Sequence, residues 1–97
     1  MIKHVVLMKW KEPITDAQLA TVNAAFTDMP KRVSGIVSSS FGADLSIFPG
    51  NADYMLVLDF ATEDDFKNYV IHPAHAELME SVTGPLMESW STAQIAI

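Results

Sequence analysis

The side chains best suited to proton transfer lie close together in the last third of the chain. Tyr69, His72 and His75 fall within the short stretch YVIHPAH. A histidine with a pKa near neutrality can take a proton from carbon. A tyrosine hydroxyl beside it can donate a hydrogen bond to a carbonyl oxygen or to the enolate formed from it. We therefore predict that His75 is a general base and that Tyr69 is the donor that stabilises the developing negative charge.

His4 is a third candidate for the same site. It lies on the otherwise apolar even-numbered face of an N-terminal segment, beside Ile2 and Val6. A buried imidazole needs a partner for its polar nitrogens, which a substrate in a cavity could supply. We expect His4 to join the catalytic residues in a cavity between a sheet and its helices. The residues expected to contact the substrate there are Phe26, Tyr54, Leu56, His72, Val6 and Met8.

Two other interpretations account for the same residues. The three histidines could bind zinc, iron or copper, because imidazole is a common ligand of these metals. Their spacing matches no recognised ligand motif, so we predict no metal site and no cofactor. Alternatively, Tyr69 packs its ring in the core, and His72 and His75 bond to free backbone carbonyls at helix ends. The sequence alone leaves this structural interpretation open.

Length and composition restrict the class of protein. The chain has 97 residues, and we expect a single domain over 1–97 because two domains would each have too small a core. A net charge of −6 with six dispersed basic residues argues against binding nucleic acid or an anionic membrane. The absence of cysteine excludes disulfides and thiol chemistry. No secretory signal or membrane-spanning segment is apparent, so we expect a cytoplasmic protein.

Alternating apolar residues predict four strands, over residues 2–11, 36–41, 54–60 and 90–97. With two intervening helices, the order strand, helix, strand, strand, helix, strand is typical of the ferredoxin-like split βαβ fold of the α+β class. In this fold both helices cover one face of an antiparallel sheet. The other face would stay bare and apolar, so we expect a second copy to cover it in a homodimer.

Capping residues and prolines predict where the helices begin and end. Thr15 fits a capping box that starts the first helix, and Pro30 is expected to end it. Thr62 caps the second helix, which Pro73 interrupts before a further helical segment begins. The intervening loop over residues 42–53 contains turn-forming and apolar residues, and we expect it to act as a lid.

The sequence resembles the stress-responsive A/B barrel family, also called Dabb domains, over nearly its whole length. The likeness is carried by IKHVVLMKWK at residues 2–11, ITDAQ at 14–18 and YVIHPAH at 69–75. This resemblance implies a ferredoxin-like protomer whose sheet pairs with that of a second copy, which together form a dimeric α+β barrel.

Within this family the chain is similar to plant polyketide cyclases, which use a histidine and a tyrosine for an intramolecular aldol condensation. His75 and Tyr69 match these two residues, and His4 and His72 match further histidines of the cyclases. The resemblance therefore implies a site inside each protomer, between the sheet and the helices.

Three departures from the cyclases bear on this implication. Phe26 replaces a tyrosine that lines the cyclase pocket, and Asn23 replaces a phenylalanine. Residues 89–97 contain no carboxylate, whereas the cyclases have an aspartate that orients the catalytic histidine. The cavity should therefore differ in size and polarity, and another group must orient His75.

The function expected from these observations is that of a homodimer binding a small, partly apolar carbonyl compound. It would act as a lyase, by aldol-type polyketide cyclisation or a related proton transfer. The first alternative is a non-catalytic stress-response or small-molecule-binding dimer module. The second is a cofactor-free monooxygenase.

Overall fold

A four-stranded antiparallel sheet forms one layer of the molecule. The computed structural model describes all 97 residues. The strand order is β2-β3-β1-β4. The strands are β1 (Ile2–Trp10), β2 (Ile36–Ala43), β3 (Tyr54–Phe60) and β4 (Met87–Ala96). β1 therefore lies in the middle of the sheet between β3 and β4, and β2 and β4 form its edges.

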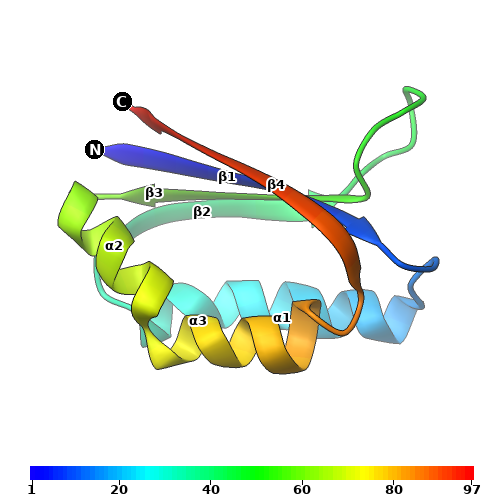
Figure 1. Cartoon of the computed structure of the whole chain (residues 1–97), viewed down its shortest axis with the longest axis horizontal. Helices are drawn as coiled ribbons and strands as arrows, with labels where there is room; N and C mark the ends of the chain where they lie inside the picture. Colours follow the sequence, from blue (N-terminus) through cyan, green and yellow to red (C-terminus); the bar gives the residue numbers. More distant parts are fainter.

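The helices form a second layer on one face of this sheet (Figure 1). They are α1 (Asp16–Arg32), α2 (Glu63–Ile71), α3 (Pro73–Leu78) and a π-helical turn η1 (Met79–Thr83). The predicted ferredoxin-like α+β fold is confirmed. The predicted break at Pro73 separates α2 from α3, and η1 is an unpredicted continuation of α3. None of the helices combines the length and hydrophobicity needed to cross a bilayer.

The core lies between the helices and the even-numbered face of β1 and β3. Along β3 every second residue is buried, and the side chains between them point to the opposite face. α1 contributes one buried stripe at helical spacing. The central members of this core are Tyr54, Leu56, Leu58 and Phe60 from β3 and Val22, Phe26 and Met29 from α1.

Helix α1 begins as predicted but ends later. The Thr15 side chain accepts a hydrogen bond from the Gln18 amide, and the Gln18 side chain accepts one from the Thr15 amide, which completes the capping box. Pro30 lies inside the helix, which continues to Arg32, so the expectation that Pro30 ends it was wrong. A proline this near the C-terminus removes only one helical hydrogen bond. The buried side chain of Met29 holds the last turn against the core.

The loop between β2 and β3 does not act as the predicted lid. It extends from the end of the sheet away from the helices (Figure 1). Its apolar residues Leu45, Ile47 and Phe48 are 79%, 83% and 64% exposed. None of them lines the cavity between the sheet and the helices. The loop is therefore an exposed apolar arm on the open side of the sheet.

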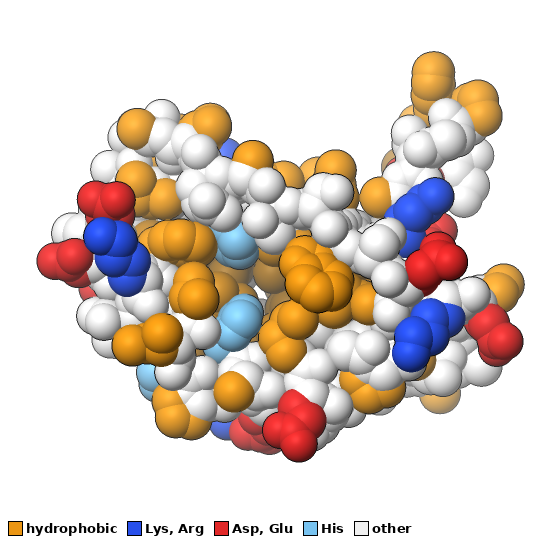
Figure 2. All heavy atoms as spheres, in the orientation of Figure 1, with side chains coloured by type: hydrophobic (Ala, Val, Ile, Leu, Met, Phe, Trp, Pro, Cys, Tyr) orange, Lys and Arg blue, Asp and Glu red, His pale blue; other side chains and the backbone are white.

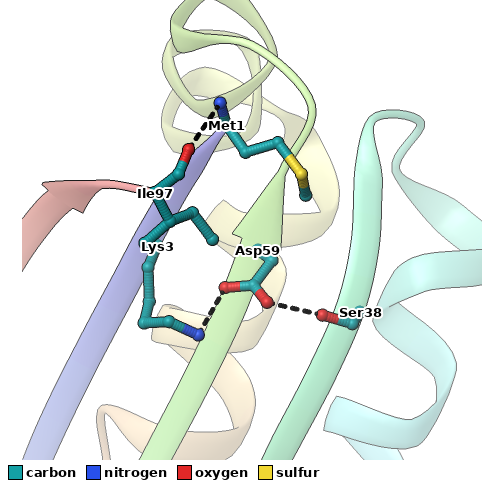
Figure 3. A network of polar contacts seen from close by, with 5 residues as sticks. All are labelled: Met1, Lys3, Ser38, Asp59 and Ile97. Carbon is teal, nitrogen blue, oxygen red and sulfur yellow. Dashed lines mark hydrogen bonds and ion pairs between the residues drawn. The ribbon is translucent and has the colours of Figure 1, made fainter.

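A polar network occupies one end of the open sheet face (Figure 3). Lys3 Nζ donates to Asp59 at 2.9 Å, and Ser38 Oγ donates to the second Asp59 oxygen at 2.7 Å. These two hydrogen bonds lower the pKa of the Asp59 carboxyl. At the adjoining edge of the sheet, the amino group of Met1 donates to the Ile97 carbonyl at 3.3 Å, which joins the two ends of the chain. Polar side chains are thus paired at this end and leave the middle of the face to apolar ones.

A substitution at Gly84 tests how much the π-helical turn contributes to stability. A Cβ on this residue would collide with the backbone carbonyl of Met79. Gly84→Ala should lower the free energy of unfolding by about 1–3 kcal/mol, since the turn must open to admit a methyl group. The measurement is denaturant unfolding. Ser81→Ala is the matched control, because Ser81 is an exposed residue of the same turn and its substitution should leave stability unchanged. Equal stability of the Gly84→Ala protein and the wild type would contradict the prediction.

Candidate functional site

A cavity of about 270 Å³ lies between the sheet and the helices. Sixteen residues line it, and eleven of them are hydrophobic. Among the lining residues Val70 and Trp90 are 46% and 56% exposed, so the cavity opens between the end of α2 and strand β4. In the space-filling view, histidine side chains appear on the wall of a hollow that hydrophobic side chains surround (Figure 2).

The break between α2 and α3 places Tyr69 and His75 at this cavity. His72 has an extended backbone conformation (φ −69°, ψ 141°), and its Nδ1 accepts a hydrogen bond from the Ala74 amide at 3.0 Å. Pro73 then opens α3, where its missing amide hydrogen costs nothing. Tyr69 therefore comes from the last turn of α2 and His75 from the first turn of α3. Their ring centroids are 4.8 Å apart and the rings are nearly perpendicular, at 67°.

His4 reaches the cavity from the sheet side. Its position on the even-numbered face of β1 leaves it 7% exposed, and its ring centroid lies 6.2 Å from that of Tyr69. The Phe66 ring packs against it at 4.9 Å. Gln94 on β4 pairs with it across the sheet, with the amide Nε2 3.0 Å from His4 Nδ1. The three candidate catalytic residues therefore line a single cavity.

Burial shifts the pKa of all three residues toward the neutral form. Desolvation lowers the pKa of His4, and repulsion from His75 lowers it further. Desolvation also lowers the pKa of His75, against a smaller opposing effect of the Val70 backbone carbonyl. Desolvation raises the pKa of Tyr69 to about 12. At neutral pH both imidazoles can therefore accept a proton, and the phenol keeps the hydrogen that it can donate.

This arrangement has the parts needed for proton abstraction next to a carbonyl group. An uncharged imidazole at the edge of a phenol can take a proton from a molecule that the phenol hydroxyl binds. The Tyr69 hydroxyl has no hydrogen-bond partner in the protein. Every fully buried side-chain oxygen has a partner, so this hydroxyl must be accessible, and it lies at the surface of the cavity. No three side chains of His, Asp or Glu come together in a way that could hold a metal ion.

Four of the six residues expected to contact the substrate line the cavity. These are Phe26, Leu56, Val6 and Met8. Tyr54 and His72 do not line it. The Tyr54 hydroxyl donates to Asn23 Oδ1 at 2.6 Å, and the His72 ring caps α3. Asn23 therefore accepts a hydrogen bond from Tyr54, and it does not change the polarity of the cavity because it does not line it.

Sequence reasoning missed the contributions of β4 and η1. Trp90, Thr92 and Gln94 alternate along β4 and pair with Met8, Val6 and His4, so all three face the cavity. The alternation in this segment was a usable signal once the neighbouring strand was known. No sequence signal predicts the π-helical turn that places Met79 and the buried Thr83 in the cavity wall.

Comparisons with known proteins agree with this fold. The family model described as the stress responsive A/B barrel domain matches residues 2–95. A dimeric ferredoxin-like protein of unknown function from Thermobifida fusca is 30% identical, with a TM-score of 0.88 over 99% of this chain and 90% of its own.

More distant structures share the fold alone. A Dabb family protein from Mesorhizobium loti is 14% identical, with a TM-score of 0.81 over 99% of this chain and 95% of its own. A hydroxynitrile lyase from Passiflora edulis is 17% identical, with a TM-score of 0.84 over 99% of this chain and 92% of its own. A search of curated protein sequences finds no match.

The two cavity histidines should make stability depend on pH. Both have a pKa below the usual value of about 6.5, so below that pH the unfolded chain binds more protons than the folded one. The free energy of unfolding should stay level above about pH 7 and fall as the pH drops through about 6.5 toward 5. Denaturant titrations across this range measure the effect.

Variants identify the source of this pH dependence. Replacing both histidines, His4→Gln and His75→Gln, should flatten the curve over the same range, because no group with a lowered histidine pKa is then left in the cavity. A wild-type curve that does not fall below about pH 6.5 would contradict the prediction.

Proposed function

Because the chain belongs to the stress-responsive A/B barrel family, matching its model over residues 2–95, we propose that it acts as a dimeric Dabb-domain enzyme. It binds a small, partly apolar carbonyl compound and removes a proton from the carbon next to the carbonyl group. The observation that carries this proposal is the pairing of Tyr69 and His75, with ring centroids 4.8 Å apart in an apolar cavity.

The reaction begins with proton abstraction by the His75 imidazole. The electron pair of the broken C–H bond forms an enolate, and the Tyr69 hydroxyl donates a hydrogen bond to its negative oxygen. In an aldol-type cyclisation the enolate carbon then attacks a second carbonyl carbon of the same molecule. The carbonyl electron pair moves to its oxygen, which takes the proton from the His75 imidazolium. The base returns to its neutral form, and no cofactor is consumed.

The cavity restricts the size and character of the substrate. Its volume of about 270 Å³ is just below the usual range for drug-sized ligands, which favours a small molecule. The mainly hydrophobic wall favours a partly apolar one. A mainly apolar wall also lowers the local dielectric constant, and this strengthens the hydrogen bond from Tyr69 to a charged oxygen.

The Val70 backbone carbonyl is the group proposed to orient His75. The resemblance to plant polyketide cyclases implies a carboxylate for this purpose, and residues 89–97 contain none. The Val70 carbonyl opposes the lowering of the His75 pKa, which is the effect of a hydrogen bond to the imidazole. An acceptor on one ring nitrogen leaves the other nitrogen unprotonated and ready to act as the base.

The lyase from Passiflora edulis supports the reaction class only through its fold. At 17% identity the likeness indicates only that this fold can support lyase activity. The hydroxynitrile in its name does not identify the substrate here. The finer likeness to plant polyketide cyclases stays part of the proposal.

Substitutions at the two central residues test the proposed catalysis. His75→Ala should slow proton abstraction by roughly 10²–10⁴-fold, since the base is lost. Tyr69→Phe should slow it by roughly 10²–10³-fold, since the oxyanion donor is lost and the ring remains. The measurements are deuterium uptake from heavy water next to the carbonyl, followed by NMR, and product analysis with a panel of β-polyketides.

The third histidine of the chain provides the matched control. His72→Asn keeps a side chain that can cap α3, and its ring does not line the cavity, so the rate should stay at the wild-type level. Deuterium uptake that survives His75→Ala undiminished would contradict the mechanism. Binding of these compounds without uptake by the wild type would favour the non-catalytic module instead.

The open face of the sheet is the surface proposed for dimer formation. Leu7 and Met55 at its centre are 41% and 46% exposed, and Ile95 on β4 is 56% exposed. An apolar face of this kind usually contacts another protein. The Thermobifida fusca relative, 30% identical to this chain, is described as dimeric. We expect a second copy to cover this face and the exposed apolar arm beside it.

A charge at the centre of this face tests the dimer. Met55→Asp should convert the protein to a monomer, because a carboxylate buried between two apolar sheets has no partner. Sedimentation or light scattering measures the mass. Ala24→Asp places the same charge on the exposed side of α1 and should leave the mass unchanged. A wild-type protein that is already monomeric, or a Met55→Asp protein that still dimerises, would contradict the proposal.

A further inference from the structure

We propose that Gln94 fixes the tautomer of His4 so that His4 Nε2–H becomes a second hydrogen-bond donor to the substrate oxygen, beside the Tyr69 hydroxyl. This inference rests on the proposed function, because it assigns a task to a residue of the same cavity. Gln94 acts as a positioning residue, and His4 as the group that touches the substrate. With His4 acting as a hydrogen-bond donor, His75 is the only base in the cavity.

The sheet holds Gln94 and His4 in register. They are direct cross-strand partners on β4 and β1, and both line the cavity. The contact joins Gln94 Nε2 and His4 Nδ1 at 3.0 Å, a normal hydrogen-bond length. Directly opposed residues of paired strands keep their side chains close together, so backbone pairing maintains this contact.

The orientation of the Gln94 amide, with Nε2 toward the ring, determines which nitrogen of His4 carries the hydrogen. The amide nitrogen of glutamine can only donate, so His4 Nδ1 must accept. A neutral imidazole that accepts at Nδ1 carries its hydrogen on Nε2. The burial that lowers the pKa of His4 favours this neutral form. The ring therefore presents an N–H group on the side away from Gln94.

That N–H group is available to a ligand. His4 has no hydrogen-bond partner other than Gln94, and no buried side-chain nitrogen or oxygen in the chain lacks a partner. The Nε2 atom must therefore reach the surface of the cavity. The Tyr69 hydroxyl meets the same cavity, and the two rings lie 6.2 Å apart between centroids. An oxygen between them could accept from both donors.

The two cavity histidines therefore have opposite hydrogen-bonding roles. The backbone carbonyl of Val70 opposes the lowering of the His75 pKa and can only accept, so it is the proposed partner of one His75 nitrogen and leaves the other as an acceptor. His4 lies against an amide donor, so its free nitrogen carries hydrogen. Two imidazoles that are both neutral at pH 7 thus become one base and one donor through their neighbours alone.

Gln94→Glu reverses the contact and is the decisive variant. A carboxylate can only accept, so the His4 hydrogen should move to Nδ1 and Nε2 should lose it. Nitrogen-15 NMR of the imidazole rings measures the tautomer directly at about pH 8, where histidine is neutral. We expect His4 hydrogen on Nε2 in the wild type and on Nδ1 in the variant. Hydrogen on Nδ1 in the wild type, or no change in the variant, would overturn the inference.

Ligand binding gives a second readout with pentane-2,4-dione, whose enolate absorbs in the ultraviolet. Loss of one donor to a charged oxygen should weaken enolate binding roughly ten- to hundredfold in Gln94→Glu. Gln94→Leu removes the amide without adding charge and should also weaken binding, which separates loss of the donor from charge repulsion. Unchanged enolate affinity in both variants would overturn the donor role of His4.

Gln18→Glu is the matched control. It makes the same chemical change at the start of α1, where a carboxylate can still accept from the Thr15 amide. Tautomer and enolate affinity should match the wild type. The outcomes also separate this inference from the proposed function. If Gln94→Glu switches the tautomer but the wild type shows no deuterium uptake, catalysis is refuted. If the wild type shows uptake but the tautomer does not switch, the role of Gln94 is refuted.

Discussion

The geometry of the candidate site depends on the break between α2 and α3. A proline disfavours helical geometry in the residue before it and lacks an amide hydrogen, so the helix must stop at His72 and can restart at Pro73. A continuous helix would place Tyr69 and His75 six positions apart, on different sides of its axis. With the break, the two rings meet at 4.8 Å. His72 supports this arrangement by capping the new helix with its own ring.

Burying His4, Tyr69 and His75 has an energetic cost, and the structure limits it by keeping all three side chains uncharged. Desolvation disfavours the charged form of each of the three residues, so all three are neutral at pH 7 and need only hydrogen bonds. His4 obtains one from Gln94, whereas the Tyr69 hydroxyl meets the cavity. Donors and acceptors without protein partners are therefore located where a ligand can satisfy them, which links the cost of folding to the specificity of binding.

Much of the fold could be predicted because its signals are local. Alternation in β1 and β3 and the capping box at Thr15 depend on neighbours a few positions away in the chain. The position of His4 on the cavity wall could be expected from the sequence, because it interrupts an apolar face. Gln94 was not, because its role exists only once β4 pairs with β1 in a given register. The π-helical turn at Met79–Thr83 likewise depends on how the chain must pack before β4 begins.

The edge strand β4 links the cavity to the open face of the sheet. Every residue of β4 after Met87 is exposed, whichever face of the sheet its side chain is on. Three of these residues nevertheless form a wall of the cavity. An exposed edge strand also presents unpaired backbone groups, which another chain can pair with or cover. A second copy packed on the open face would restrict the movement of β4 and therefore the position of Gln94. The precision of the His4 contact should then increase with dimer formation, although both residues belong to one protomer.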